Sequence, residues 1–317
     1  MIKEKHRGIL AAASANIIFG LNIPVTKSLM SHWMTPLGYT ISRMYFGTAV
    51  FWLIGLFLKK EKVTVKDLII MMIGGLIGYP GTQFLFSQSM RYTTPVIFSL
   101  LMALTPVVAL LLSALFLKET ISNRKIAGII ISISGAAFVI LNSGKVSTGS
   151  NNSLGIIFVI ACVFFYASYM VITRKISAKY NPLTIAKWMF LFSAVVLFPL
   201  SFSGLQGQRI YSDETNFRAL SLLAYAFLFS TTLAFFFMPF ALKRLEAGTV
   251  SIFMNLQPLV ASVVAIAVGQ DLFTWDKIAA AVLVLTGVYL VSGNGTKRFK
   301  YKKPLTEKPE PQRRKER

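Results

Sequence analysis

Long apolar runs separated by short polar segments dominate the sequence. A helix that crosses a lipid bilayer needs about 20 mostly apolar residues, and ten such runs follow one another along the chain. The pattern therefore predicts an all-α polytopic membrane protein with ten transmembrane helices. The predicted helices cover residues 8–30, 36–58, 66–89, 94–117, 124–142, 154–174, 182–203, 217–240, 247–269 and 274–293.

Two segments fall outside this pattern. Residues 143–153 are polar and rich in Gly, Ser and Asn, which is typical of a flexible connector. Residues 294–317 are basic and contain Pro, which is typical of a disordered tail. We therefore expect a five-helix unit at 1–142, the connector, a second five-helix unit at 154–293, and the tail.

Composition supports a membrane location. Residues of the types AVILMFWYC make up 55% of the 317 positions, whereas charged residues make up only 14%. So few charges cannot cover a soluble globule of this size, and lipid must cover much of the surface. A net charge of +21 is compatible with nucleic-acid binding. However, the basic residues lie between apolar runs and in the tail, so we expect no nucleic-acid partner.

Lys and Arg are distributed unevenly between the two sets of loops. With a cytoplasmic N-terminus, the cytoplasmic segments before the tail hold 15 of them, and the opposite segments hold six. Lys and Arg are enriched in cytoplasmic loops. We therefore expect both termini in the cytoplasm and the protein in the cell inner (plasma) membrane. The six residues on the opposite side are Lys27, Arg91, Lys145, Arg209, Arg218 and Lys277.

The two halves of the chain resemble each other. A shift of 152 residues aligns 95–140 with 247–292, and the shared Pro, Gly and charged positions favour duplication over chance similarity of apolar helices. Each half holds five spans, so the second half must enter the membrane from the opposite side. Inverted repeats of this kind occur in many secondary transporters, with the substrate site near the midplane. Identical pairs include Ser99/Ser251, Met102/Met254, Pro106/Pro258, Lys125/Lys277 and Gly135/Gly287.

An ordered set of motifs is similar to the EamA branch of the drug/metabolite transporter (DMT) superfamily. The motifs are FGLNIPVTK at 19–27, Arg43 in the second helix, and a proline-containing helix followed by an acid at 99–122, repeated at 251–274. The resemblance covers residues 8–293. It implies a ten-helix fold with a central cavity and the export or exchange of small metabolites, without indicating one substrate.

Arg43 and Lys187 are basic residues placed inside predicted spans. A charge near the bilayer centre costs about 2.5–3.5 kcal/mol on insertion scales. Such a residue can attract an anionic group or take part in gating. It can also extend to the interface or bind a helix-terminal carbonyl. We favour this structural interpretation for Lys187, which lies close to the interface, and leave both open for Arg43.

Acidic residues are informative through their positions. Glu119 and Asp271 lie at equivalent helix ends, where we expect them to pair with nearby bases. The second site departs from the family's usual Gly-Glu by having Gly269-Gln270-Asp271. The middle third of each predicted span contains no Asp or Glu. The small multidrug-resistance relatives carry a buried carboxylate in their first helix for proton-driven export of cations. Its absence points to neutral, zwitterionic or anionic cargo.

Polar and aromatic residues within the spans are candidates for a substrate site. Small-molecule sites are mostly apolar pockets with a few orienting polar groups. Tyr79 and Gln83 are four residues apart and share a helix face, so they are the strongest candidates for a cavity wall. Helix packing is the alternative explanation for each residue. The predicted substrate-binding residues are Asn16, Phe19, Asn22, Tyr79, Gln83, Ser99, Met102, Tyr166, Tyr169, Phe236, Ser251 and Asn255.

Pro24, Pro106 and Pro258 lie inside predicted helices. Pro24 frees the carbonyl of Gly20, because proline lacks a backbone N–H. Such backbone is tolerated in a membrane only where protein or a wet cavity satisfies it. Pro106 and Pro258 are expected to kink equivalent helices, which would let them bend during alternating access. A static kink is the alternative.

The sequence offers no evident enzymatic site. The only two histidines lie at span ends, and no Walker-type phosphate loop is present, so we expect no metal, no cofactor and no ATP-driven transport. The favoured hypothesis is a monomeric secondary transporter that exports or exchanges small metabolites such as amino acids by alternating access among membrane lipids. The alternatives are a membrane-embedded lipid-modifying enzyme, for which an acid/base pair is missing, and a non-transporting receptor or scaffold, for which an inverted repeat has no purpose.

Overall fold

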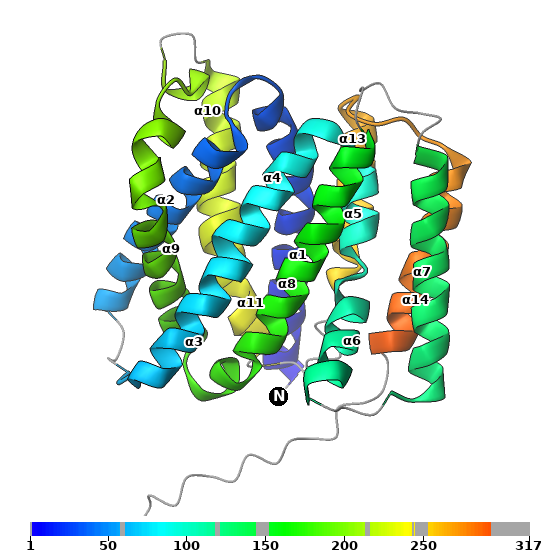
Figure 1. Cartoon of the computed structure of the whole chain (residues 1–317), viewed down its shortest axis with the longest axis horizontal. Coiled ribbons are helices and arrows are strands. Elements are labelled where there is room, and N and C mark those ends of the chain that lie inside the picture. The colour runs from blue at the N-terminus through cyan, green and yellow to red at the C-terminus, as the bar shows by residue number, and fades with distance from the viewer. Residues whose placement is uncertain are drawn as a thin grey trace, which may run out of the picture.

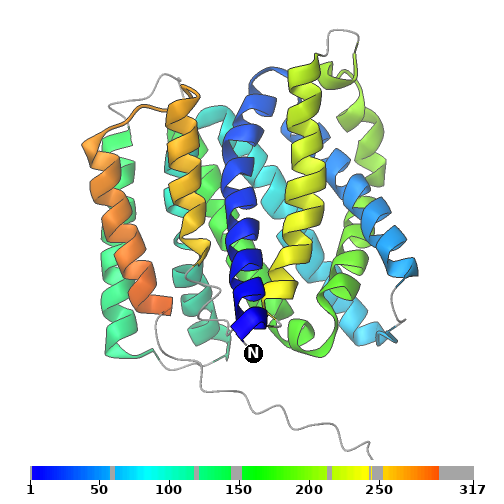
Figure 2. The ribbon, with the colours of Figure 1, turned by 180° about the vertical axis from the view of Figure 1, so that it is seen from behind.

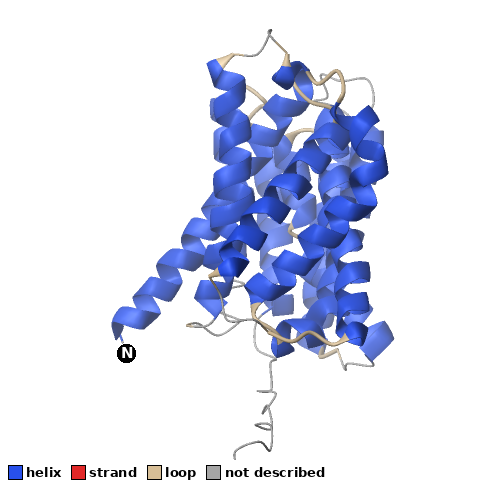
Figure 3. Ribbon diagram, turned by 90° about the vertical axis from the view of Figure 1, so that its left-hand side faces the viewer, coloured by secondary structure: helices blue, strands red, loops and turns tan. Residues whose placement is uncertain are grey.

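Every regular element in the described part of the chain is a helix, and the helices run between two ends of one bundle (Figures 1 and 3). The computed structural model describes residues 2–57, 61–117, 121–143, 152–212, 216–242, 244 and 253–292. Within them, eight segments are long and apolar enough to span a membrane, which makes this an all-α multi-pass membrane protein. They are Glu4–His32, Val65–Tyr92, Pro95–Phe116, Asn123–Asn142, Asn152–Arg174, Pro182–Leu205, Phe217–Met238 and Trp275–Ser292.

The elements follow the order of the apolar runs. The first half contains α1 (Ile2–His32), α2 (Pro36–Leu56), α3 (Val65–Leu76), η1 (Ile77–Gly81), α4 (Thr82–Tyr92), α5 (Pro95–Met102), α6 (Thr105–Leu117) and α7 (Asn123–Ser143). The second half contains α8 (Asn152–Lys179), α9 (Pro182–Leu205), η2 (Arg209–Tyr211), α10 (Phe217–Ala224), η3 (Tyr225–Leu233), α11 (Ala234–Leu242), α13 (Leu256–Ala267) and α14 (Trp275–Ser292).

Two predicted spans are not among the eight. Helix α2 has 21 residues, enough for a span, but Arg43 and the neighbouring hydroxyl residues lower its hydropathy. Helix α13 has only 12 residues, and the first part of the predicted span 247–269 falls outside the described residues. The predicted polar connector and basic tail also lie largely outside them.

Several helices begin at a polar residue followed by proline. Thr35, Thr94 and Asn181 each have extended backbone, and each side chain accepts a hydrogen bond from a backbone N–H in the first helical turn. The proline that follows each of them has no N–H to leave unsatisfied and already has a helical φ. These signals start α2, α5 and α9 immediately after short connections.

The helices are interrupted at equivalent positions in the two halves. Segments η1 and η3 are π-helices in the third span of each half. The Thr82 hydroxyl donates to Ile77 O (3.1 Å) in η1, and the Thr231 hydroxyl donates to Ala226 O (2.9 Å) in η3. The predicted helix 94–117 also breaks, since α5 ends at Met102 and α6 starts at Thr105. Helix α13 begins at Leu256, the repeat equivalent of Leu104 in that break.

Helices of one half pack against helices of the other. Helix α1 contacts α11 and α13, whereas α8 contacts α4 and α6. Figure 2 shows α1 running between α13 and α11. Helix α2 packs on α9, and α7 packs on α14 at one side of the bundle (Figure 1). Gly20 allows the close approach of α1 to α13, because a Cβ there would lie 2.9 Å from Gln257 O.

Candidate functional site

A cavity of about 210 Å³ lies between the helices of the two halves. Its wall is formed by α1, α2, η1 and α4 to α6 of the first half, and by α8, η3, α11, α13 and α14 of the second half. Seven of the predicted substrate-binding residues line it, together with three residues predicted for gating or structure. These ten are Phe19, Asn22, Gln83, Ser99, Met102, Tyr166, Asn255, Arg43, Pro106 and Pro258.

Arg43 lies on this wall and is only 4% exposed. Its guanidinium donates to the Thr231 hydroxyl through Nε (2.9 Å), to the Ser230 hydroxyl through Nη2 (3.2 Å), and more weakly to the Tyr39 hydroxyl through Nη1 (3.5 Å). These acceptors are neutral, and no carboxylate among the described residues forms an ion pair with Arg43. A guanidinium has five N–H donors, so the site keeps positive charge and unused donors next to the cavity.

Three side-chain amides on the cavity wall are unused. Asn22, Gln83 and Asn255 all line the cavity, and no hydrogen bond joins their amide groups to the described residues. Asn22 is only 5% exposed, and its Oδ1 is fully buried without a partner. A buried polar group without a partner costs about 1–3 kcal/mol. These groups are therefore available to a molecule or to water in the cavity.

The rest of the wall is mostly apolar. Seven large side chains of Phe and Met contribute to it, and they come from both halves: Phe19, Phe86, Phe98, Met102, Phe235, Met238 and Met254. Methionine side chains adapt to occupants of different shape. Pockets for drug-sized ligands have volumes of about 300–1,000 Å³, so the smaller cavity here suits a small metabolite.

Tyr79 does not line the cavity, although its predicted partner Gln83 does. The Tyr79 ring packs against Tyr169, Phe190 and Phe235, with centroid distances of 5.9, 4.6 and 5.6 Å. Gly78, which precedes it, lines the cavity instead. The two residues that were expected to form one wall are thus separated because aromatic rings from distant segments enclose the phenol.

Four other predicted residues lie away from the cavity lining. Tyr169 belongs to the same aromatic group as Tyr79, and Phe236 is 44% exposed on the outside of the bundle. The Lys187 ammonium lies over the rings of Trp52 (4.8 Å) and Trp188. Asn16 is fully buried and accepts a hydrogen bond from Gln257 Nε2 (2.7 Å). Asn16 therefore supports a residue that does line the cavity.

Two further predicted residues, Ser251 and Glu119, lie outside the described residues. Asp271 is described and nearly buried, and its Oδ1 pairs with the Lys277 ammonium. This ion pair ties the loop after α13 to the first turn of α14. It agrees with the expectation that this acid binds a nearby base at a helix end.

Polar contacts join the helices where α1 and α4 end and α14 begins, a region called here the His32 end of the bundle. The Lys27 ammonium donates to the carbonyls of Met90 (2.7 Å) and Thr93 (2.9 Å), which links α1 to α4. Gln270 Nε2 donates to Ser28 Oγ (2.7 Å) and Pro24 O (3.0 Å), which links the loop after α13 to α1.

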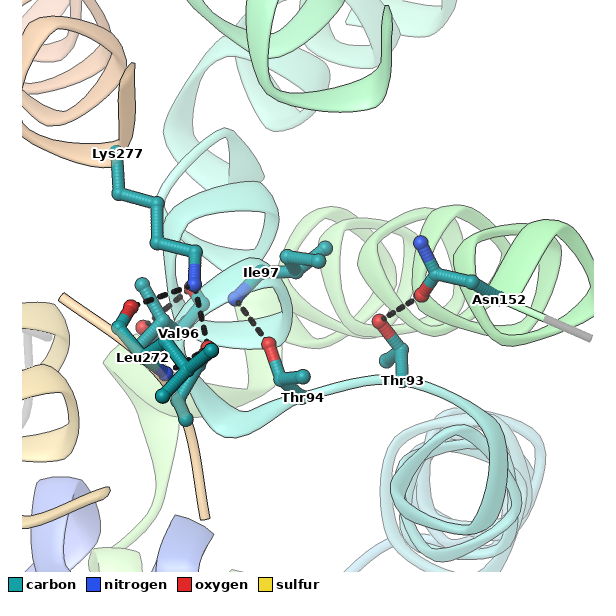
Figure 4. Close-up of polar contacts among 9 residues, drawn as sticks. Thr93, Thr94, Val96, Ile97, Asn152, Leu272 and Lys277 are labelled. Carbon is teal, nitrogen blue, oxygen red and sulfur yellow. Dashed lines mark hydrogen bonds and ion pairs between the residues drawn. The ribbon is translucent and has the colours of Figure 1, made fainter. Parts of the chain in front are cut away.

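Figure 4 shows further contacts at this end. The Thr93 hydroxyl donates to Asn152 Oδ1 (2.7 Å), and the Lys277 ammonium donates to Leu272 O (2.8 Å). Thr94 accepts a hydrogen bond from Ile97 N–H (3.4 Å) and so caps α5. The contacts of Thr93 with Asn152 and of Gln270 with α1 join the two halves of the chain at the His32 end.

Sequence reasoning missed several residues of this arrangement. Ser230 and Met238 line the cavity, and Lys27 and Gln270 join the helices at the His32 end. The signals for Lys27 and Gln270 were present, because each lies within or directly after an apolar run. Ser230 carries no such signal, because Ser in a transmembrane helix commonly bonds its own backbone.

Comparisons with known proteins agree on one family. The sequence profile of the EamA-like transporter family matches residues 6–141 and again residues 153–293. The uncharacterized transporters YyaM and YetK of Bacillus subtilis (strain 168) are 26% and 24% identical. The YyaM alignment covers 74% of this chain and 76% of that protein, and the YetK alignment covers 92% and 88%.

Two other similarities extend the comparison. A protein of Streptantibioticus cattleyicolor described as a "probable terminal-alkyne amino-acid exporter" is 27% identical over 70% of each chain. A solved crystal structure superposes with a TM-score of 0.60 at 18% identity, covering 88% of this chain and 98% of the other. At that identity the likeness concerns the fold alone.

Proposed function

The chain belongs to the EamA-like transporter family of the drug/metabolite transporter superfamily, and on this premise we propose that it exports or exchanges small neutral, zwitterionic or anionic metabolites. The proposed setting is the cell inner membrane, and the proposed mechanism is alternating access without ATP hydrolysis. Amino acids are included among the candidate substrates because one relative is described as an amino-acid exporter.

The cavity between the two halves carries this proposal. Its wall combines a buried guanidinium that lacks a carboxylate partner, unused amides, and adaptable apolar side chains. A structural scaffold would be more stable with these polar groups paired or replaced by apolar ones. A binding site near the membrane midplane gives them a purpose.

Alternating access is supported by the arrangement of interruptions. The π-helices η1 and η3 and the starts of α6 and α13 lie at equivalent positions of the two halves, and they border the cavity. Irregular backbone inside a membrane is tolerated where it lines a cavity, and many transporters have it at the substrate site. We propose ten transmembrane helices in two inverted five-helix repeats, with the His32 end facing outward and both termini in the cytoplasm.

Transport measurements with the purified full chain in liposomes test the proposal. Vesicles loaded with an unlabelled compound would take up its labelled form by counterflow, with a panel of amino acids, hydroxy acids, oxo acids and sugars. We expect accelerated exchange of at least one compound relative to protein-free vesicles, and no requirement for a pH gradient. Absence of exchange for the whole panel by folded protein would contradict the transporter function.

A further inference from the structure

The transporter function proposed above leaves the charge of the substrate open. Resting on that function, we infer that the cavity selects small monoanionic carboxylates, such as 2-oxo and 2-hydroxy acids with an apolar side chain. Zwitterionic amino acids and cationic amines of the same size are disfavoured. The inference concerns the substrate class of the cavity already described.

The first observation is the balance of charge. Among the described residues that line the cavity, Arg43 carries the only charged side chain. Its hydrogen-bond partners are hydroxyl groups, which do not neutralise it. Asp271 is nearly buried as well, but it is not part of the cavity lining and pairs with Lys277. One unbalanced positive charge in a medium of low dielectric constant favours an occupant with one negative charge.

The second observation is the orientation of the interrupted helices. Thr105 and Pro106 at the start of α6, and Gln257 and Pro258 at the start of α13, line the cavity. A helix N-terminus carries partial positive charge, and broken helices in transporters commonly bind anionic substrate groups there. Their positive contribution is small beside that of Arg43, because helical residues 101–102 and 253–254 end directly before α6 and α13 and carry the opposite partial charge.

The third observation concerns the unused amides. Asn22 is nine-tenths buried, lines the cavity and has no hydrogen-bond partner, and Gln83 Nε2 is also buried without one. An amide group donates and accepts hydrogen bonds without carrying charge. It therefore suits a neutral oxo or hydroxyl group next to a carboxylate. An ammonium group would lack a negative partner and would be repelled by Arg43.

Four probes with the same carbon skeleton isolate the effect of charge. They are 2-oxo-4-methylpentanoate and 2-hydroxy-4-methylpentanoate as monoanions, L-leucine as the zwitterion, and L-leucinamide as the cation. Counterflow into vesicles containing the full chain would be compared at one pH, with protein-free vesicles correcting for passive permeation. We expect the monoanions to exchange about tenfold faster than leucine, because charges a few ångströms apart interact strongly away from water. No exchange of leucinamide is expected.

Substitutions of Arg43 test whether its positive charge causes the preference for monoanions. Arg43→Gln is expected to remove the preference for the monoanions, whereas Arg43→Lys keeps the charge and most of the preference. Lys187→Gln is the control, since it also removes a basic residue from a span but leaves the cavity lining unchanged. Thermal unfolding of each purified variant, with and without 2-oxo-4-methylpentanoate, separates loss of binding from loss of folding.

The outcomes separate the two proposals. Faster exchange of leucine than of both monoanions, or a preference that survives in a folded Arg43→Gln variant, overturns the inference and leaves the transporter function standing. Failure of these probes and of the broad metabolite panel with folded protein overturns both. Monoanion preference that depends on the charge at residue 43 supports the inference.

Discussion

Buried polar side chains in and beside the cavity differ in whether the fold gives them hydrogen-bond partners. Asn16 and Asn22 are two buried amides on α1. The Asn16 amide donates to Ala12 O (2.8 Å) and accepts from Gln257, whereas Asn22 has no partner. We therefore infer that Asn16 stabilises the fold and that Asn22 binds the substrate in the cavity.

Replacing each amide by leucine tests this distinction. Asn22→Leu is expected to leave stability unchanged or raise it by about 1 kcal/mol, because an unsatisfied buried amide is removed. Transport is expected to fall at the same time. Asn16→Leu is the matched control, and it should destabilise the protein because Gln257 loses its acceptor. Unfolding midpoints in detergent and counterflow rates measure the two effects. Equal destabilisation by both substitutions would contradict the proposed roles.

The direction of individual side chains was the least predictable feature. The repeat and the polar residues within spans pointed to Asn22, Gln83, Ser99 and Asn255 as candidates, and these residues do meet in one cavity. Tyr79 was expected with them but packs against aromatic residues from α9 and α11. Helix periodicity indicates which residues share a face. It does not indicate which neighbouring helix that face will contact.

Among the elements, the π-helix η3 is coupled directly to Arg43. Thr231 donates to Ala226 O and accepts from Arg43 Nε, whereas Thr232 donates to Phe227 O (3.2 Å) without contacting Arg43. Both hydroxyls bind the carbonyl five residues earlier, which satisfies backbone groups in the wider turn. Of the two threonines, only Thr231 therefore links the wider turn of η3 to the guanidinium of Arg43 on α2.

Valine substitutions separate these contributions, because valine keeps the shape of threonine and removes the hydroxyl. Thr232→Val is expected to cost about 0.5–1.5 kcal/mol, as for a neutral hydrogen bond. Thr231→Val should cost more, about 1.5–3 kcal/mol, because a buried guanidinium also loses an acceptor. Thermal unfolding of the two purified variants is the measurement. Equal losses would show that the Arg43 bond contributes nothing beyond the backbone contact.

The contacts of Lys27 at the His32 end are expected to hold α1 and α4 together when the cavity is closed on that side. Lys27→Met removes the donors to Met90 O and Thr93 O and should open this end more often. Cys162 is the only cysteine of the chain and lines the cavity, so it reports access without further engineering. Its labelling by a small membrane-impermeant thiol reagent added outside should be faster in the variant.

Lys179→Met is the control for this experiment, because Lys179 pairs with Asp67 at the opposite end of the bundle. The hydrogen bond to Asp67 raises the pKa of Lys179, so this ion pair is fully formed near neutral pH. The control variant should not accelerate labelling from outside. Unchanged labelling in Lys27→Met, or equal acceleration in both variants, would contradict a closing role for Lys27.

The whole molecule follows the hydrophobic pattern closely because a bilayer permits few alternatives. Backbone polar groups inside lipid must be satisfied within the span, so long apolar runs form helices. The pattern did not reveal the break at residues 103–104 or the π-helices, since these depend on local backbone competition rather than on hydropathy. Pairing of α1 with α11 and α13 was equally hidden, because contacts between distant helices leave no periodic signal.

The orientation of the chain in the membrane can be tested with reporter proteins that are active on only one side of it. Lys and Arg favour the cytoplasm at the end opposite His32, and five spans per half reverse the direction of the second half. Alkaline phosphatase inserted after residue 148 should therefore be active outside the cytoplasm. Green fluorescent protein fused at the C-terminus should be fluorescent inside the cell. If both positions report the same side, the second half contains an even number of spans, and the inverted repeat is wrong. Opposite sides would make Arg174, Glu119 and Lys125, the repeat equivalents of Lys27, Asp271 and Lys277, the residues to examine for closure at the cytoplasmic end.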